Sequence, residues 1–123
     1  MKTFLVVEDS KIIRTIAARA LEDMGFATIE TGDGQSALDI CKKELPDAIL
    51  LDELLPKKDG FAFMKAFRAM QGAEDVPVIF CSSKTDPEDI QKALDAGADE
   101  YIMKPFDNEI LKFKINLLDL EQE

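Results

Sequence analysis

Short apolar runs alternate five times with longer stretches of helical periodicity, and this rhythm constrains the fold more than any other feature. In the first helical stretch, residues 10–24, apolar side chains recur every three or four positions. Most of the apolar runs lack the polar alternation of a strand with one wet face, so both faces are expected to be buried. The expected strands are residues 3–7, 26–30, 48–51, 76–80 and 99–103.

The helical stretches carry recognisable boundary residues. Aspartates that can cap a helix N-terminus precede the later stretches, and glycines suited to a left-handed C-terminal position follow two of them. The expected caps are Asp33, Asp59, Asp86 and Asp107, and the glycines are Gly25 and Gly97.

Strands buried on both faces and joined by helices predict a doubly wound α/β domain with a parallel sheet covered on both sides. Right-handed crossovers leave few topologies. The strand order 2-1-3-4-5 is the common one at this size, although the sequence does not dictate it. Such sheets place their functional crevice beyond the carboxyl ends of the strands, where strands one and three meet.

Composition excludes several classes of function. The chain has 123 residues, enough for one domain, and a formal charge of −10, which makes nucleic acid and anionic membrane surfaces poor partners. It contains no histidine, which removes the usual general base and zinc ligand. Cys41 and Cys81 make no disulfide framework and are expected to be small buried residues. No apolar run approaches the roughly 18 residues of a membrane span, so we expect a cytoplasmic protein.

Polar residues gather after the expected strands. They are Glu8 and Asp9, Asp52 and Glu53, Ser82 and Ser83, and Lys104. Two carboxylates about 4 Å apart repel by roughly 4 kcal/mol at an effective dielectric of 20, so such a cluster needs a cation. A ligand set of oxygens without histidine or thiolate favours a hard ion such as Mg²⁺. A lone acid after a strand is more often a cap or a solvated residue, and it is the coincidence on adjacent strands that favours a site.

Four segments resemble the receiver domain of bacterial response regulators. Each is weak alone, but their order and spacing together are specific, and the likeness covers essentially the whole chain. The segments are VVEDS at 6–10, LLDELLPKKDG at 50–60, PVIFCSS at 77–83 and GADEYIMKPF at 97–106. The resemblance implies a flavodoxin-like (βα)5 fold and a phosphoacceptor switch.

The resemblance also implies a role for each matching residue. Asp52 corresponds to the phosphoacceptor, and Lys104 and Ser82 correspond to the groups that contact the phosphoryl oxygens. Glu8, Asp9, Asp52 and the backbone carbonyl of Leu54 would bind Mg²⁺ or Mn²⁺. Tyr101 would be the aromatic residue that moves inward on activation. The Lys104–Pro105 bond is expected to be cis, an isomer accessible almost only before proline.

The implied partners are a histidine kinase or histidine phosphotransfer protein and a downstream protein that contacts the fourth and fifth helices and the fifth strand. We expect residues 1–123 to form a single receiver domain with no output domain, as a monomer or weak dimer. It would be no enzyme beyond catalysing its own phosphorylation and dephosphorylation. An alternative is a degenerate receiver that binds a protein without being phosphorylated.

Two other classes fit less well. A flavodoxin needs a hydroxyl-rich and glycine-rich phosphate loop after strand one, where this chain has Glu8 and Asp9. A dehalogenase-type phosphatase needs a second aspartate two residues after the nucleophile, where this chain has Leu54.

The last helix has two adjacent apolar stripes, of which the core needs one. The first comprises Ile110, Phe113, Leu117 and Leu120, and the second comprises Leu111, Ile115 and Leu118. The second stripe is either a margin of the core or a partner surface, and we assign Leu111, Ile115 and Leu118 to a candidate partner surface.

Overall fold

The computed structural model describes residues 1–118 and 120. Five parallel strands form one sheet in the order β2-β1-β3-β4-β5, as predicted. Their bounds are β1 Thr3–Val7, β2 Ala27–Thr31, β3 Ala48–Asp52, β4 Val78–Ser82 and β5 Glu100–Met103. The expected doubly wound α/β fold is therefore confirmed.

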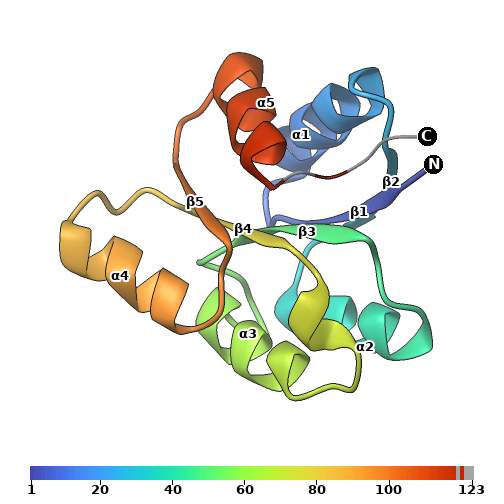
Figure 1. Ribbon diagram of the computed structural model, residues 1–123, viewed down its shortest axis with the longest axis vertical. Coiled ribbons are helices and arrows are strands. Elements are labelled where there is room, and N and C mark those ends of the chain that lie inside the picture. The colour runs from blue at the N-terminus through green and yellow to red at the C-terminus, as the bar shows by residue number, and fades with distance from the viewer. Residues whose placement is uncertain (119, 121–123) are drawn as a thin grey trace.

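Helices cover both faces of the sheet (Figure 1). α1 and α5 lie on one face, and α2, α3 and α4 lie on the other. The helices are α1 Lys11–Asp23, α2 Gly34–Lys43, α3 Gly60–Arg68, α4 Pro87–Asp95 and α5 Asn108–Leu117, with a short 3₁₀ turn η1 at Ala73–Asp75. The aspartate caps form at three sites, where Asp33, Asp59 and Asp107 accept backbone N–H bonds of 2.7–2.9 Å.

Each face of the sheet has its own core. Phe63 and Phe67 of α3 stack beneath the sheet beside Phe80 of β4, together with residues of α2 and α4. On the other face, Leu21 and Leu111 pack against β1, β3 and β4. Cys41 and Cys81 are buried free thiols, and burial raises the pKa of Cys41 to about 11. The prediction that they are small core residues is confirmed.

The structure corrects two local expectations. β4 runs two residues further along the chain than the apolar run predicts, so Ser82 is its last residue. Asp86 stands before α4, but its side chain makes no capping hydrogen bond. α4 therefore begins on the fixed backbone of Pro87, and only its Ala93 is buried.

Not all the apolar residues of α1 pack against the sheet. The buried residues of α1 are Leu21 and the small residues Ala17, Ala18 and Ala20, which let the helix lie close to the sheet. The isoleucines Ile12, Ile13 and Ile16 remain 74%, 41% and 59% exposed. These three residues lie on the first turns of α1 and form an apolar surface there.

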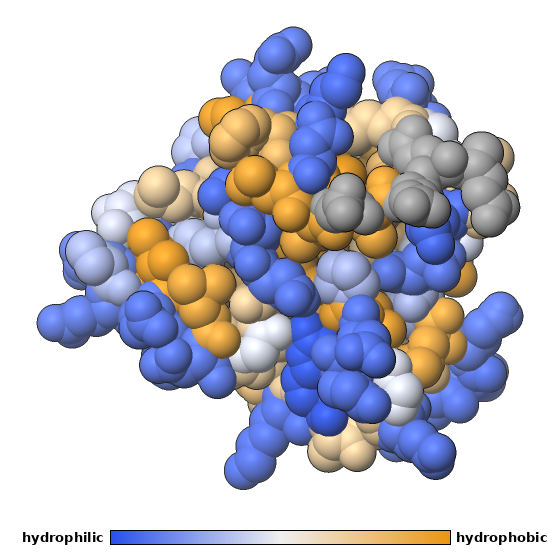
Figure 2. Space-filling view, viewed as in Figure 1, coloured by the Kyte–Doolittle hydropathy of each residue, from blue (hydrophilic) through white to orange (hydrophobic). Residues whose placement is uncertain are grey.

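The assignment of a partner surface on α5 is wrong. Leu111 and Ile115 are 0% and 4% exposed, and Leu118 packs against the same core, so this stripe faces the sheet. Ile110, Phe113 and Leu117 are 44%, 60% and 52% exposed and form the outer stripe. Figure 2 shows hydrophobic residues gathered over α5, and others over α4. The two stripes lie side by side on the helix, so only packing decides which is inside.

Within residues 1–118 and 120, no helix has the length and apolar character needed to span a bilayer.

Candidate functional site

The ends of four strands meet at one edge of the sheet. Val7 pairs with Leu51, Asp52 with Cys81, and Ser82 with Met103. The residues that end or follow these strands therefore share an edge, as parallel strands require. The backbone N–H of Lys104 also donates to the carbonyl of Ser82 at 2.8 Å, which holds the start of the β5–α5 loop against β4.

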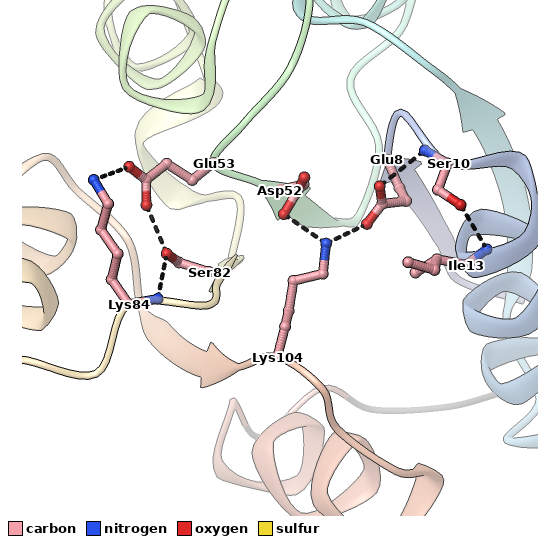
Figure 3. Close-up of polar contacts among 8 residues, drawn as sticks. All are labelled: Glu8, Ser10, Ile13, Asp52, Glu53, Ser82, Lys84 and Lys104. Carbon is pink, nitrogen blue, oxygen red and sulfur yellow. Dashed lines mark hydrogen bonds and ion pairs between the residues drawn. The ribbon is translucent and has the colours of Figure 1, made fainter.

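Lys104 connects two acidic side chains from different strands (Figure 3). Its Nζ lies 2.7 Å from Glu8 Oε1 and 3.0 Å from Asp52 Oδ1. Glu8 and Asp52 are each 7% exposed. The other oxygen of Glu8 accepts the N–H of Ser10 at 3.0 Å, which fixes this carboxylate at the start of α1. Residues 8, 52 and 104, far apart in the sequence, are thus brought together. The Lys104–Pro105 peptide bond is cis, as expected.

The predicted metal ligands are only partly assembled. Glu8 and Asp52 share the Lys104 amine, whereas Asp9 is exposed. In residues 1–118 and 120, no three acidic, histidine or cysteine side chains come together as a metal-binding group. The donor chemistry nevertheless fits a hard cation, because the two buried carboxylates share a single amine and the donors are oxygens. Leu54 follows β3 with its side chain 68% exposed, and the role of its carbonyl stays a prediction.

Burial controls the ionisation of this group. Burial raises the pKa of Asp52, the hydrogen bond from Lys104 opposes this, and the nearby charge of Glu8 adds to it, so that the pKa lies above the usual value. Burial lowers the pKa of Lys104, but the bonds and charges of Glu8 and Asp52 outweigh it, so its pKa is raised. Folding therefore favours the charged form of Lys104 and disfavours the charged form of Asp52.

Replacing Asp52 by Asn should stabilise the domain at neutral pH. A carboxyl whose pKa is raised by folding binds its proton more tightly in the folded state. The free energy of unfolding therefore falls as pH rises from the unfolded pKa to the folded pKa. Removing the charge leaves Glu8 and Lys104 as a balanced pair, and we expect a gain of about 1 kcal/mol in the free energy of unfolding. The gain should vanish below the ordinary pKa of 3.8. Urea unfolding across pH measures it, with the exposed Asp23→Asn as control; a loss of stability at neutral pH would contradict this explanation.

A second polar group lies beside the first and was not predicted as a group. Glu53 is 7% exposed and accepts the hydroxyl of Ser82 at 2.6 Å and the amine of Lys84 at 2.9 Å. Ser82 is buried, as its place at the end of β4 requires. The position of Glu53 directly after Asp52, at the end of a buried strand, could have indicated this group. A glutamate buried there needs hydrogen-bond donors, because an unpaired buried carboxylate is costly.

Tyr101 lies inward in this structure. Its side chain is 6% exposed, its ring stacks near Phe80 with centroids 6.2 Å apart, and its hydroxyl donates to the carbonyl of Lys84 at 2.8 Å. Tyr101 thus connects β5 to the segment that follows β4. Its movement on activation stays a prediction.

Residues 4–116 match the response regulator receiver domain. The chain belongs to this family. Receiver domains are signalling switches of two-component systems, and the strand order and the convergence of residues 8, 52 and 104 agree with that membership.

Solved receiver domains share the whole fold of this receiver domain. The chemotaxis protein CheY4 of Vibrio cholerae superimposes with a TM-score of 0.90 at 31% identity, covering 96% of this chain and 98% of that one. The receiver domain of the sensor histidine kinase PA1611 from Pseudomonas aeruginosa has a TM-score of 0.85 at 28% identity, covering 97% of this chain and 98% of that one. That structure has a magnesium ion coordinated in its active-site cleft. Magnesium binding is thus seen in a member of the same family, at the active-site cleft of that protein.

The curated relatives are longer than this receiver domain. The transcriptional regulatory protein CseB of Streptomyces coelicolor is 40% identical over 111 residues, which is 90% of this chain and 46% of that protein. The phosphate regulon regulator PhoB of Escherichia coli is 38% identical over 105 residues, 85% of this chain and 46% of PhoB. The chain thus spans about half the length of these relatives. Because they are named as transcriptional regulators, the expected lack of a nucleic-acid partner applies only to the acidic surface of this chain.

Proposed function

We propose that this receiver domain accepts a phosphoryl group on Asp52 and thereby changes the surface of α4, β5 and α5 that a protein partner reads. The observation that supports this most is the buried Asp52–Lys104–Glu8 group, because a carboxylate, a fixed cation and a second acid meet there. Phosphoryl transfer depends mainly on positioning and charge neutralisation.

The residues have distinct parts in the proposed step. An Asp52 carboxylate oxygen attacks the phosphorus, and the bond from phosphorus to the leaving group breaks. Lys104 Nζ, 3.0 Å from Asp52 Oδ1, neutralises charge on the phosphoryl oxygens. Mg²⁺ held by Glu8, Asp9, Asp52 and the Leu54 carbonyl would supply further positive charge. The aspartyl phosphate carries a charge of about −1.5 to −2 in place of the single charge of the carboxylate, and its phosphoryl oxygens attract nearby donors.

We propose that the phosphoryl donor, a histidine kinase or histidine phosphotransfer protein, docks on the first turns of α1. The exposed Ile12, Ile13 and Ile16 lie there, and Ile13 and Ile16 line an apolar pocket that also contains Lys104 and Phe106. A donor seated on this surface would hold its phosphohistidine close to Asp52. For the downstream partner, the outer α5 stripe of Ile110, Phe113 and Leu117 is a better candidate surface than the first turns of α1.

Acetyl phosphate tests this function without a kinase. Incubation with acetyl phosphate and Mg²⁺ should add the mass of one phosphoryl group to the intact protein, with acetate as the leaving group. Asp52→Asn should show no increase under the same conditions. If the wild type shows no increase, phosphorylation is refuted and a phosphorylation-independent binding module becomes the better explanation.

A further inference from the structure

Glu53 holds the Ser82 hydroxyl, which a phosphorylated Asp52 would need, and the amine of Lys84. Its Oε1 accepts the Ser82 hydroxyl at 2.6 Å, and its Oε2 accepts Lys84 Nζ at 2.9 Å (Figure 3). Both carboxylate oxygens are therefore used. Hydrogen bonds to a carboxylate acceptor are shorter and stronger than those to a neutral acceptor.

The Ser82 hydroxyl cannot serve two acceptors at once. A serine hydroxyl has a single hydrogen to donate, and here it points to Glu53. Its oxygen already accepts the backbone N–H of Lys84 at 3.1 Å. A phosphoryl oxygen on Asp52 can therefore gain the Ser82 hydrogen bond only if Glu53 loses it.

Glu53 also tethers the segment between β4 and α4. The Lys84 side chain is bound to Glu53, which directly follows β3. The backbone carbonyl of Lys84 accepts the hydroxyl of Tyr101, in β5, at 2.8 Å. The hydrogen bond and charge of Glu53 raise the pKa of Lys84. Because residues 83–86 are all exposed, these contacts hold a segment with little packing of its own. Lys84 itself has a side chain 52% exposed, so it can leave Glu53 for water at small cost.

We propose that Glu53 is a positioning residue that withholds the Ser82 hydroxyl from the phosphoryl group and tethers Lys84, so that phosphorylation must displace it. This rests on the proposed phosphorylation of Asp52. The added phosphoryl charge beside Glu53 repels its carboxylate and competes for its donors. Displacement frees Lys84 and, through its carbonyl, changes the contact with Tyr101. Displacing Glu53 thereby uses part of the binding free energy of the phosphoryl group before the α4–β5–α5 surface changes.

The test uses a phosphoryl mimic and the protein's own fluorophore. The chain has one tyrosine and no tryptophan, so intrinsic fluorescence reports Tyr101 alone. Beryllofluoride with Mg²⁺ is titrated into the wild type and into two variants. Glu53→Met keeps the length of the side chain but removes the acceptor, and Glu53→Gln keeps an acceptor but removes the charge. Glu100→Gln is the matched control, since Glu100 pairs with Lys114 at 3.2 Å in α5.

We expect Glu53→Met to bind beryllofluoride about tenfold more tightly than the wild type, Glu53→Gln to be intermediate, and Glu100→Gln to be unchanged. In a Ser82→Ala background, most of the Glu53→Met gain should disappear. If Glu53 had only a structural role, Glu53→Met would bind beryllofluoride as tightly as the wild type or more weakly, or its gain in affinity would persist in full in the Ser82→Ala background. Either result overturns the proposal. If the wild type neither binds beryllofluoride nor accepts a phosphoryl group from acetyl phosphate, the proposed function itself fails.

Discussion

Replacing Ile115 by Glu should unfold the domain rather than weaken a partner interaction. Ile115 is 4% exposed and packs in the core between α1, α5 and the sheet. A carboxylate there would be buried without a partner, and the lost packing adds to that cost, so we expect a loss of about 4 kcal/mol in the free energy of unfolding. Urea unfolding followed by circular dichroism measures it.

The matched control lies on the same helix. Phe113 is 60% exposed, so Phe113→Glu should change stability by about 0.5 kcal/mol or less. Equal stabilities of the two variants would contradict the assignment of Leu111, Ile115 and Leu118 to the core. A folded Phe113→Glu protein is also the right reagent for testing the outer stripe as a partner surface.

Replacing Lys104 by Met should destabilise the domain in the absence of divalent ions. The amine lies within 3.0 Å of both Glu8 and Asp52, and its loss leaves two buried carboxylates facing each other without a cation. Breaking one partner of a buried pair is costly, and with Lys104 partly exposed we expect about 2 kcal/mol. Thermal or urea unfolding in the presence of a chelator measures this.

Added Mg²⁺ should then recover part of the lost stability, because an ion that binds the folded state raises its stability by mass action. The recovery should be larger for Lys104→Met than for the wild type, whose amine already neutralises the acids. Lys114→Met is the control, since Lys114 bridges Glu100 outside the site at 3.2 Å. If it destabilises as much as Lys104→Met, the amine has no special part in holding the acids together.

Local signals predicted much of this structure. The caps at Asp33, Asp59 and Asp107 form because a capping bond depends on a few neighbouring residues. The meeting of Glu8, Asp52 and Lys104 follows from parallel strands ending at one edge. The caps need only the local sequence, and the meeting of the three residues needs only the order of the elements.

Other features depend on packing that periodicity does not specify. Both α5 stripes are apolar, and the sheet takes the one containing Ile115. In α1, the alanines at 17, 18 and 20 face the sheet and leave Ile12 and Ile16 outside. The Glu53–Ser82 bond depends on side-chain orientation and on β4 reaching Ser82, two residues beyond its expected end.

The most direct test of the account is to locate the phosphoryl group. After treatment with acetyl phosphate and Mg²⁺, the acyl phosphate can be reduced with borohydride and the modified residue identified by peptide mass spectrometry. We expect modification at Asp52 alone, in the peptide that contains residues 48–57. Modification at another residue, or none in any peptide, would contradict the account.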